Sequence, residues 1–519
     1  MVPAVPPASQ GRRGRRLLPS ARPGTAAERF AWLVRAIRAY HGDADLTDTA
    51  RFTARLNDHL RVPLREGTVG KLENGQVEFT FERCAAYERV LGLTEDSLLD
   101  AYIYQFRSAG LTPKADPHGP VTAHDLELVV RIAQQNPLTP REWLEAASFL
   151  AGHRELFPAG PALDVFMFGL LEATRDAFEH DLRLLREALI VVGTPAVPYI
   201  VELVDTEPIR YFNNIEVLGY LDDRTALDAL AALGRNLDDS VLAQTTLEAL
   251  QRIVHRTSLT LPDLAEPGRA IQRYCAEVLS DPDSAYTARE EALGLLSLPH
   301  AEVPRRRRAT LVELRDDLNQ LRIRPRFSTR DDIVRAVFDQ NRDLLKESGT
   351  LPGGMPAAVP GLETILSHSL FGHTRIDRLN GAVLLSSFPF AGVLSRALGD
   401  VLLNRVHPQD YGLQRAMLRL MTKAGNGQAS GYFTTFAMGG IVDDNTRLTV
   451  AWALGGGNKA NDETALRHLY QVSSTSVTKR VIVNSAARRG FRSLLELAAA
   501  ARDSRVAAEA RRALSRDPH

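Results

Sequence analysis

The chain has 519 residues, which is too long for one ordinary domain core and predicts a small module joined to a larger body or repeat array. Lysine plus arginine and aspartate plus glutamate are equal at 63 each, so no global field attracts nucleic acid and any attraction must come from a local patch. The two cysteines, Cys84 and Cys275, exclude a disulfide framework and a cysteine-rich zinc site, and they fit a reducing cytoplasm.

Residues 1–24 are rich in proline, glycine, serine and arginine, a composition that cannot bury enough apolar surface to order itself. We expect a disordered basic arm that either lies along a DNA minor groove or has no fixed partner, and its cations are Arg12, Arg13, Arg15 and Arg16. No apolar core follows these arginines, so the arm is not a secretory signal, and no later segment has the ~20 apolar residues of a spanning helix. The arginine bias of the chain is typical of GC-rich coding DNA, as in actinobacteria, and we expect a bacterial cytoplasmic protein.

Two amphipathic helices are predicted at the start of the next segment, residues 25–110. In the first, AAERFAWLVRAIRAYHG, one face carries the apolar side chains Phe30, Leu33, Val34 and Ile37. In the second, TDTARFTARLNDHL, the apolar face consists of Phe52, Leu56 and Leu60. A Thr47 or Asp48 cap is expected to begin this second helix, and Pro63 is expected to end it.

The stretch REGTVGKLENGQ, residues 65–76, predicts a third, short helix. Val69 and Leu72 are three positions apart and face inward, which leaves a polar surface facing outward. The dipeptide Asn74-Gly75 supplies a left-handed C-terminal turn. A short polar helix held against two others is the geometry that can enter a DNA major groove.

Two more helices are expected to complete the segment. FTFERCAAYERVLGL places Phe81, Cys84, Ala85 and either Val90 or Leu91 inward. TEDSLLDAYIYQFRSAG begins with an acidic stretch, residues 94–97, that is similar to a capping box. Residues 111–120, LTPKADPHGP, then predict a linker.

Residues 26–93 resemble the Cro/C1-type (XRE) helix-turn-helix domain. The closest part is TVGKLENGQVEFTFERCAAYERVLGL, which is similar to the family's Thr-Ile-x-x-hydrophobic-Glu-x-Gly segment and to its last helix ending in Leu-Gly. The resemblance implies that the short helix is a recognition helix whose base-facing or groove-facing residues are Arg65, Glu66, Thr68 and Lys71. It further implies phosphate contacts by Asn74 and Gln76, and a structural ion pair between Glu73 and Arg38 of the first helix. Arginine and lysine suit guanine N7 and O6.

Residues 121–519 predict helices of about ten to twenty residues that are broken by Gly, Pro, Asp and Asn. The recurrence of helix-turn-helix units at roughly 35–45 residues is similar to HEAT and armadillo repeats. Such units must stack to bury their apolar faces, so we expect an all-α chain with an α-solenoid-like body. A compact irregular all-helical domain is the alternative, and residues 260–375 fit the repeat least well.

Four other stretches have both a functional and a structural interpretation. The arginine run 305–308 favours a solvated helix start over a second nucleic-acid patch. The glycine run 453–462 lacks the residue order of a phosphate-binding loop and predicts an inter-helix loop. Residues 425–440 predict a loop and a buried helix rather than a ligand pocket. His368 and His373 do not have the spacing of a metal pair on one helix face, so we predict no metal, cofactor or enzymatic activity.

Two functions of different class remain. The first is a sequence-specific, DNA-binding transcriptional regulator whose partner is double-stranded DNA. Its body would dimerise, or sense a peptide, protein or small-molecule effector, and a homodimer is expected because two-fold pairing doubles the contacts to half-sites about 34 Å apart. The second is an α-solenoid scaffold for a protein or peptide, with a helix-turn-helix-like docking module that does not bind DNA. The neutral overall charge and the glycines Gly67 and Gly70 in the recognition helix favour this second function.

Overall fold

The computed structural model describes most of the chain, and all structural statements concern these residues: 24–39, 41, 43–113, 121–153, 160–221, 223–233, 240–257, 273, 275–279, 292, 328–348, 361–372, 375–425, 429–441, 443–457 and 461–516. Every regular element in this part of the chain is helical, and no strand occurs in it. The predicted all-α class is therefore confirmed.

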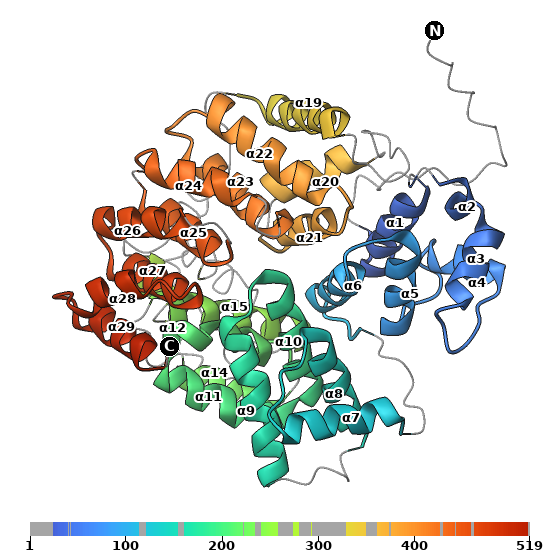
Figure 1. The fold of residues 1–519 in the computed structure, drawn as a ribbon, viewed down its shortest axis with the longest axis horizontal. Coiled ribbons are helices and arrows are strands. Elements are labelled where there is room, and N and C mark those ends of the chain that lie inside the picture. Colours follow the sequence, from blue (N-terminus) through green and yellow to red (C-terminus); the bar gives the residue numbers. More distant parts are fainter. Residues whose placement is uncertain are drawn as a thin grey trace, which may run out of the picture.

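The N-terminal module contains six helices, drawn in blue in Figure 1: α1 (Ala26–Ala39), α2 (Ala44–Thr47), α3 (Thr49–Asn57), α4 (Glu66–Leu72), α5 (Phe81–Leu91) and α6 (Ser97–Ser108). The apolar faces predicted for the first two helices are buried, apart from Leu60, which is only partly covered. At the centre, the ring of Phe30 lies 4.9 Å from that of Phe79 and 5.2 Å from that of Tyr102. These edge and tilted aromatic contacts join α1, the segment before α5, and α6 into one core.

The second predicted helix begins where it was expected but ends early. It is α3, and its N-cap is Asp48, whose carboxylate accepts from the backbone N–H of Arg51 at 2.9 Å and whose extended backbone separates α3 from the short helix α2. It ends at Asn57, six residues before Pro63, where the end was expected. The side chain of Asn57 accepts from Leu64 N at 2.7 Å and donates to Leu64 O at 3.0 Å, so it fixes the loop of residues 58–65 that leads into α4.

The start of α6 is held by a residue from another helix rather than by the predicted capping box. The carboxylate of Glu88 in α5 accepts from Leu98 N at 2.7 Å, from Leu99 N at 2.9 Å and from Asp96 N at 3.0 Å. Three of the amide groups that begin a helix without intrahelical partners are therefore satisfied. The side chain of Asp96, the residue that precedes the helix, makes no cap hydrogen bond and is directed to the body instead.

The body begins with a run of helices after the linker region. Its first part comprises α7 (Ala123–Ala133), α8 (Pro140–Gly152), α9 (Pro161–Asp176), α10 (Glu179–Val192), η2 (Thr194–Ala196), α11 (Val197–Thr206), α12 (Pro208–Tyr211), η3 (Phe212–Asn214), α13 (Ile215–Leu218), α14 (Arg224–Leu233) and α15 (Ser240–Thr257). Its second part comprises α19 (Arg330–Ser348), α20 (Leu362–Phe371), α21 (Arg375–Ser386), α22 (Ala391–Arg405), α23 (Tyr411–Ala424), α24 (Ser430–Met438), α25 (Asp444–Gly455), α26 (Asp462–Val472), α27 (Ser476–Arg488), α28 (Arg492–Ala499) and α29 (Ser504–Arg516). Neighbouring helices pack in pairs, a repeat-like arrangement.

The body curves round until its last helices lie beside later helices of its first part, as the red and green ribbons near α27 and α12 in Figure 1 show. Helix α12 packs against α27, and the ring of Phe178, just before α10, lies 5.7 Å from the ring of Trp452 in α25. In an ideal solenoid each repeat touches only its neighbours in sequence. The contacts between residues near 180 and residues near 450 therefore close the body on itself.

The module is attached to both parts of this body through α6, which packs against α10 and α21. Gln105 donates to Asn380 O at 3.1 Å, and Ser108 donates to Asn380 Oδ1 at 2.7 Å. Trp32 of α1 packs against Phe388 with ring centroids 6.0 Å apart. The module is consequently a docked part of the fold.

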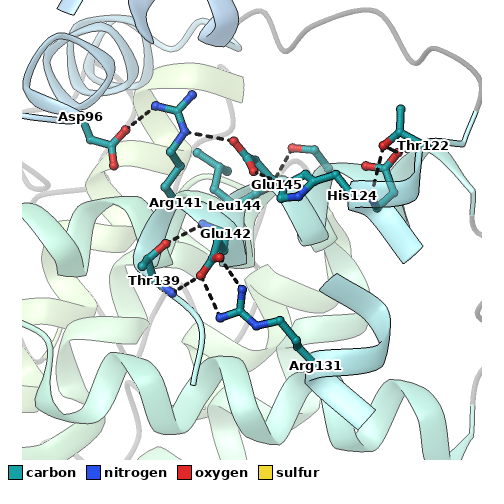
Figure 2. A network of polar contacts seen from close by, with 11 residues as sticks. Asp96, Thr122, His124, Arg131, Thr139, Arg141, Glu142, Leu144 and Glu145 are labelled. Atoms are coloured by element: carbon teal, nitrogen blue, oxygen red, sulfur yellow. Dashed lines mark hydrogen bonds and ion pairs between the residues drawn. The ribbon is translucent and has the colours of Figure 1, made fainter. Parts of the chain in front are cut away.

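A polar network extends this attachment to α8, as Figure 2 shows. The guanidinium of Arg141 donates to Asp96 at 2.7 Å and to Glu145 at 3.0 Å. Glu145 in turn contacts Nε2 of His124 on α7 at 3.0 Å. The start of α6 is thereby tied to the first two helices of the body.

No single helix in the described part of the chain has the length and apolar composition to cross a membrane. The segments Glu179–Val192 and Thr194–Thr206 reach that composition only when they are taken together, and the chain bends by 112° between them.

Candidate nucleic-acid interface

One side of helix α4 packs in the core of the module, and the opposite side faces solvent. Val69 and Leu72 are both 0% exposed and pack in the core of the module. Arg65, Glu66 and Lys71 lie on the opposite, exposed side. In Figure 1, α3 and α4 occupy the edge of the module that faces away from the body. The polar side of α4 is therefore accessible from solvent.

A buried ion pair joins the end of α4 to α1. Arg38 donates Nε to Glu73 Oε1 at 2.5 Å and Nη2 to Glu73 Oε2 at 2.6 Å, and the two residues are 8% and 4% exposed. The remaining guanidinium nitrogen, Nη1, donates to the carbonyls of Leu46 and Thr47, both at 3.1 Å. Burial lowers the pKa of Arg38, but the bonded Glu73 carboxylate more than offsets this and raises that pKa. This is the pair that the sequence resemblance implies, and it fixes α4 relative to α1 and α2.

The other residues expected at the interface do not all have free side chains. Thr68 is half-buried, whereas Asn74 and Gln76 are exposed. The amide of Asn74 is already engaged at both ends, since it accepts from Arg35 Nη1 at 3.2 Å and donates to Gly70 O at 2.6 Å. Sequence reasoning did not identify Arg35, which reaches the end of α4 only because α1 crosses it. The arm arginines 12, 13, 15 and 16 lie outside the described residues.

The arginines of α3 are occupied by acids that sequence reasoning did not consider. Arg51 is bonded to Asp45, and Arg55 contacts Asp45 at 3.2 Å and Asp43 at 3.8 Å. The hydrogen bond from Arg51, with its charge, lowers the pKa of Asp45 below its ordinary value. These pairs neutralise much of the positive charge beside α4. Arg65 and Lys71 are the exposed cations that α4 itself contributes to this surface.

The two glycines within α4 have open space around them. A Cβ atom added at Gly67 or at Gly70 would meet nothing within 4 Å. Replacing Gly67 by alanine is therefore expected to raise the unfolding free energy by roughly 0.5–1 kcal/mol, because alanine loses less backbone entropy in a helix. Urea denaturation of the full chain measures the change.

Gly75 provides the matched control for that substitution. Its φ is +68°, and an added Cβ would lie 3.3 Å from the carbonyl oxygen of Ala27. Gly75→Ala is therefore expected to destabilise the module. Equal effects of the two substitutions would show that α4 is not helical at Gly67.

No family model matches this chain, and no curated protein matches it. Among solved structures the chain is similar to a crystal structure of an engineered protein, with 15% sequence identity and a TM-score of 0.20. That alignment covers 76% of this chain and 98% of the other. So low a TM-score carries no argument, and the function has to be inferred from the residues of this chain.

The other stretches singled out in the sequence do not form a site in the described part of the chain. Of the glycine run 453–462, residues 453–455 end α25 and Asp462 begins α26, while 456, 457 and 461 lie between the two helices and residues 458–460 lie outside the described residues. Residues 430–438 form the partly buried helix α24. The arginine run 305–308 and His373 also lie outside them. Among the described residues, no group of three or more histidine, cysteine, aspartate or glutamate side chains could hold a metal ion.

Proposed function

We propose that this chain is a sequence-specific DNA-binding transcriptional regulator of the bacterial cytoplasm, in which α4 enters the major groove. The observation that carries the proposal is the way α4 is presented. It is anchored by Val69 and Leu72 and locked to α1 by Glu73, while Arg65 and Lys71 are exposed at the edge of the module. A short helix held in this manner by two others is the arrangement with which helix-turn-helix proteins read base edges.

The chemistry of the exposed side divides into base contacts and backbone contacts. Arg65 and Lys71 suit the acceptors N7 and O6 of guanine, and Glu66 suits the amino group of cytosine. Gln76 suits donation to a phosphate, and the guanidinium of Arg35, which is bonded to Asn74, lies at the same end of α4. One α4 spans only a few base pairs, so we propose a homodimer that places two such helices on half-sites about 34 Å apart. The body would supply the dimer contacts, the response to an effector, or both.

Removing the two exposed cations of α4 tests the proposal. The variant Arg65→Ala/Lys71→Ala should bind selected genomic fragments at least roughly 30-fold more weakly, since each good base contact is worth about 1–3 kcal/mol and two of them are lost. Fluorescence anisotropy at several salt concentrations measures this loss. The slope of log K against log salt should also become shallower for each phosphate contact that is lost.

The control variant is Arg502→Ala/Arg505→Ala, which removes two exposed cations from the C-terminal end of the body. It changes the net charge by the same amount and should leave the affinity within about twofold, because charges far from the DNA are screened. Equal weakening by both variants would reduce the interaction to non-specific charge attraction. Unchanged binding by the α4 variant, with its fold retained, would contradict the proposal.

A second function is favoured by one specific observation, the neutralisation of Arg51 and Arg55 by Asp45. DNA-binding surfaces need clustered cations, and internal pairing removes two of them. The module could instead dock a protein partner without operator specificity, with the body as the scaffold. The same binding experiment separates the two functions, because a docking module would retain no genomic fragment above the level seen with heparin-blocked protein.

A further inference from the structure

A network of alternating charges connects the module, the first part of the body and the second part of the body. Arg183 of α10 donates Nε to Asp100 Oδ1 of α6 at 2.5 Å and Nη2 to the other oxygen at 2.5 Å. The same guanidinium contacts Glu179 Oε2 at 3.4 Å, and that oxygen is bonded to Lys423 of α23. The order Asp100, Arg183, Glu179, Lys423 therefore links three parts of the chain that are far apart in sequence.

These four groups are largely buried and comprise two anions and two cations. His180 of α10 also contacts Asp100, with Nδ1 3.4 Å from Oδ2. The side chains of Asp100, Glu179 and Arg183 are at most 11% exposed. Lys423 lies at one end of the network, and its side chain is partly exposed. A buried charge is tolerated only while its partner remains in place. The loss of one cation consequently changes the environment of each carboxylate that remains.

Within this network, Glu179 is the residue whose conformation can change. Its φ is +41°, a region that side-chain-bearing residues rarely adopt, so the first residue of α10 has a strained backbone. Both carboxylate oxygens of Glu179 are engaged, because Oε1 accepts from Trp452 Nε1 at 3.3 Å while Oε2 contacts Arg183 and Lys423. Contacts from the second part of the body thus hold Glu179 in its strained conformation.

We propose that this network of charges couples the closure of the body to the docking of the N-terminal module. When the second part of the body withdraws Lys423, Glu179 keeps its ion pair with Arg183 and loses its ion pair with Lys423. Its backbone relaxes, α10 shifts at its first turn, and Arg183 loses its two-fold bond to Asp100. The docking of α6 on α10 then weakens, although Lys423 itself makes no direct contact with the module. The coupling is independent of what the module binds.

The same two helices contain a second ion pair that serves as the internal reference. Arg107 of α6 donates to both oxygens of Glu187 of α10, at 2.9 Å and 2.7 Å. Glu187 lies two turns further along α10 than Glu179, and neither member of the pair contacts Lys423. This pair should therefore be insensitive to the state of Lys423, whereas the pair of Arg183 and Asp100 should respond to it.

The test is hydrogen exchange on the full chain, read on peptides from α6. Lys423→Met should increase the exchange of α6 amides by about tenfold or more, since local opening of a docked helix governs its protection. The matched control is Lys479→Met, a lysine of the second part of the body whose Nζ lies 5.6 Å from the Tyr470 ring centroid. It should leave α6 unchanged. Faster exchange confined to α23 and α25 would overturn the proposal.

A double-mutant cycle distinguishes coupling from general destabilisation. Lys423→Met combined with Asp100→Asn should depart from additivity by about fivefold or more in the opening equilibrium of α6, because both substitutions remove charges of the same network. Lys423→Met combined with Arg107→Gln should be additive. Additivity in both cycles would overturn the proposal.

If Lys423→Met does not fold, Trp452→Phe removes the indole N–H group that reaches Glu179, together with the five-membered ring that carries it, and keeps a six-membered aromatic ring in place. It should raise α6 exchange in the same direction by a smaller factor. No change at α6 in Trp452→Phe, together with an unfolded Lys423→Met, would also overturn the proposal.

Discussion

Replacing Arg38 by methionine is expected to lower the unfolding free energy of the N-terminal module by about 3–5 kcal/mol. Glu73 would be left as a buried carboxylate without its cation, and the carbonyls of Leu46 and Thr47 would each lose a donor. These three groups come from the end of α4 and from α2, so a single substitution disconnects two elements from α1. Urea denaturation of the full chain, followed by hydrogen exchange in α1 and α4, measures the change for the module separately from the body.

The matched control is Arg51→Met, which breaks an ion pair that solvent already screens. The side chain of Arg51 is 69% exposed and that of its partner Asp45 is 39% exposed. Its loss should leave the unfolding free energy nearly unchanged, because solvent screens an exposed ion pair. Equal costs for the two arginines would show that Arg38 and Glu73 are not buried in solution.

A double variant refines the interpretation of the Arg38 result. Arg38→Met/Glu73→Leu removes both charges and fills the space with apolar atoms, so it should recover much of the stability lost in Arg38→Met. If the double variant is as unstable as the single one, the decisive loss is the pair of carbonyl contacts to Leu46 and Thr47, and the charge of Glu73 has little part in it.

The second large effect is a pH dependence that arises at Glu88. Burial raises the pKa of Glu88 to about 7, and the charge of Asp96 adds to this, although three backbone N–H groups act in the opposite direction. Between pH 4.5 and pH 7 the folded state then holds more protons than the unfolded state. Stability therefore falls as pH rises through this window, and the contribution of Glu88 is about 3 kcal/mol. Above pH 7 the carboxyl group is ionised in both states and the contribution is constant.

The difference between the wild type and Glu88→Gln isolates this contribution, because every other group titrates in both proteins. We expect the unfolding free energy of the wild type, minus that of Glu88→Gln, to decrease between pH 4.5 and pH 7 and to level off above pH 7. Thermal or urea unfolding at four pH values measures it. A difference that rises with pH would mean that the bonds from Asp96, Leu98 and Leu99 dominate over burial and lower the pKa.

Much of the module could be predicted from local patterns. The apolar residues of α1, α3 and α4 recur three or four positions apart, and this spacing is the same in every helix with one buried face. Asp48 could be identified as one of two candidate caps, and it is the one that caps α3. The pair of Arg38 and Glu73, 35 residues apart, could be anticipated only from the resemblance to a helix-turn-helix family.

The candidate site was less predictable than the helix that carries it. The exposure of Arg65 and Lys71 follows from the inward position of Val69 and Leu72. The bond from Arg35 to Asn74 and the bond from Arg51 to Asp45 depend on how α1, α2 and α3 cross, and helix crossing is set by side chains distant in sequence. The electrostatic character of the interface could therefore not be inferred from a count of charges.

The sequence by itself determined the all-α class, the positions of most helices of the module and the side of α4 that faces solvent, because each depends on residues within a few positions of one another. Only the tertiary structure decided that Glu88 begins α6, that α6 docks on the body, and that Lys423 meets Glu179. Those contacts join residues up to 275 positions apart. They depend on which helices pack against one another, and a periodicity of three or four residues holds no information about which distant helices will meet.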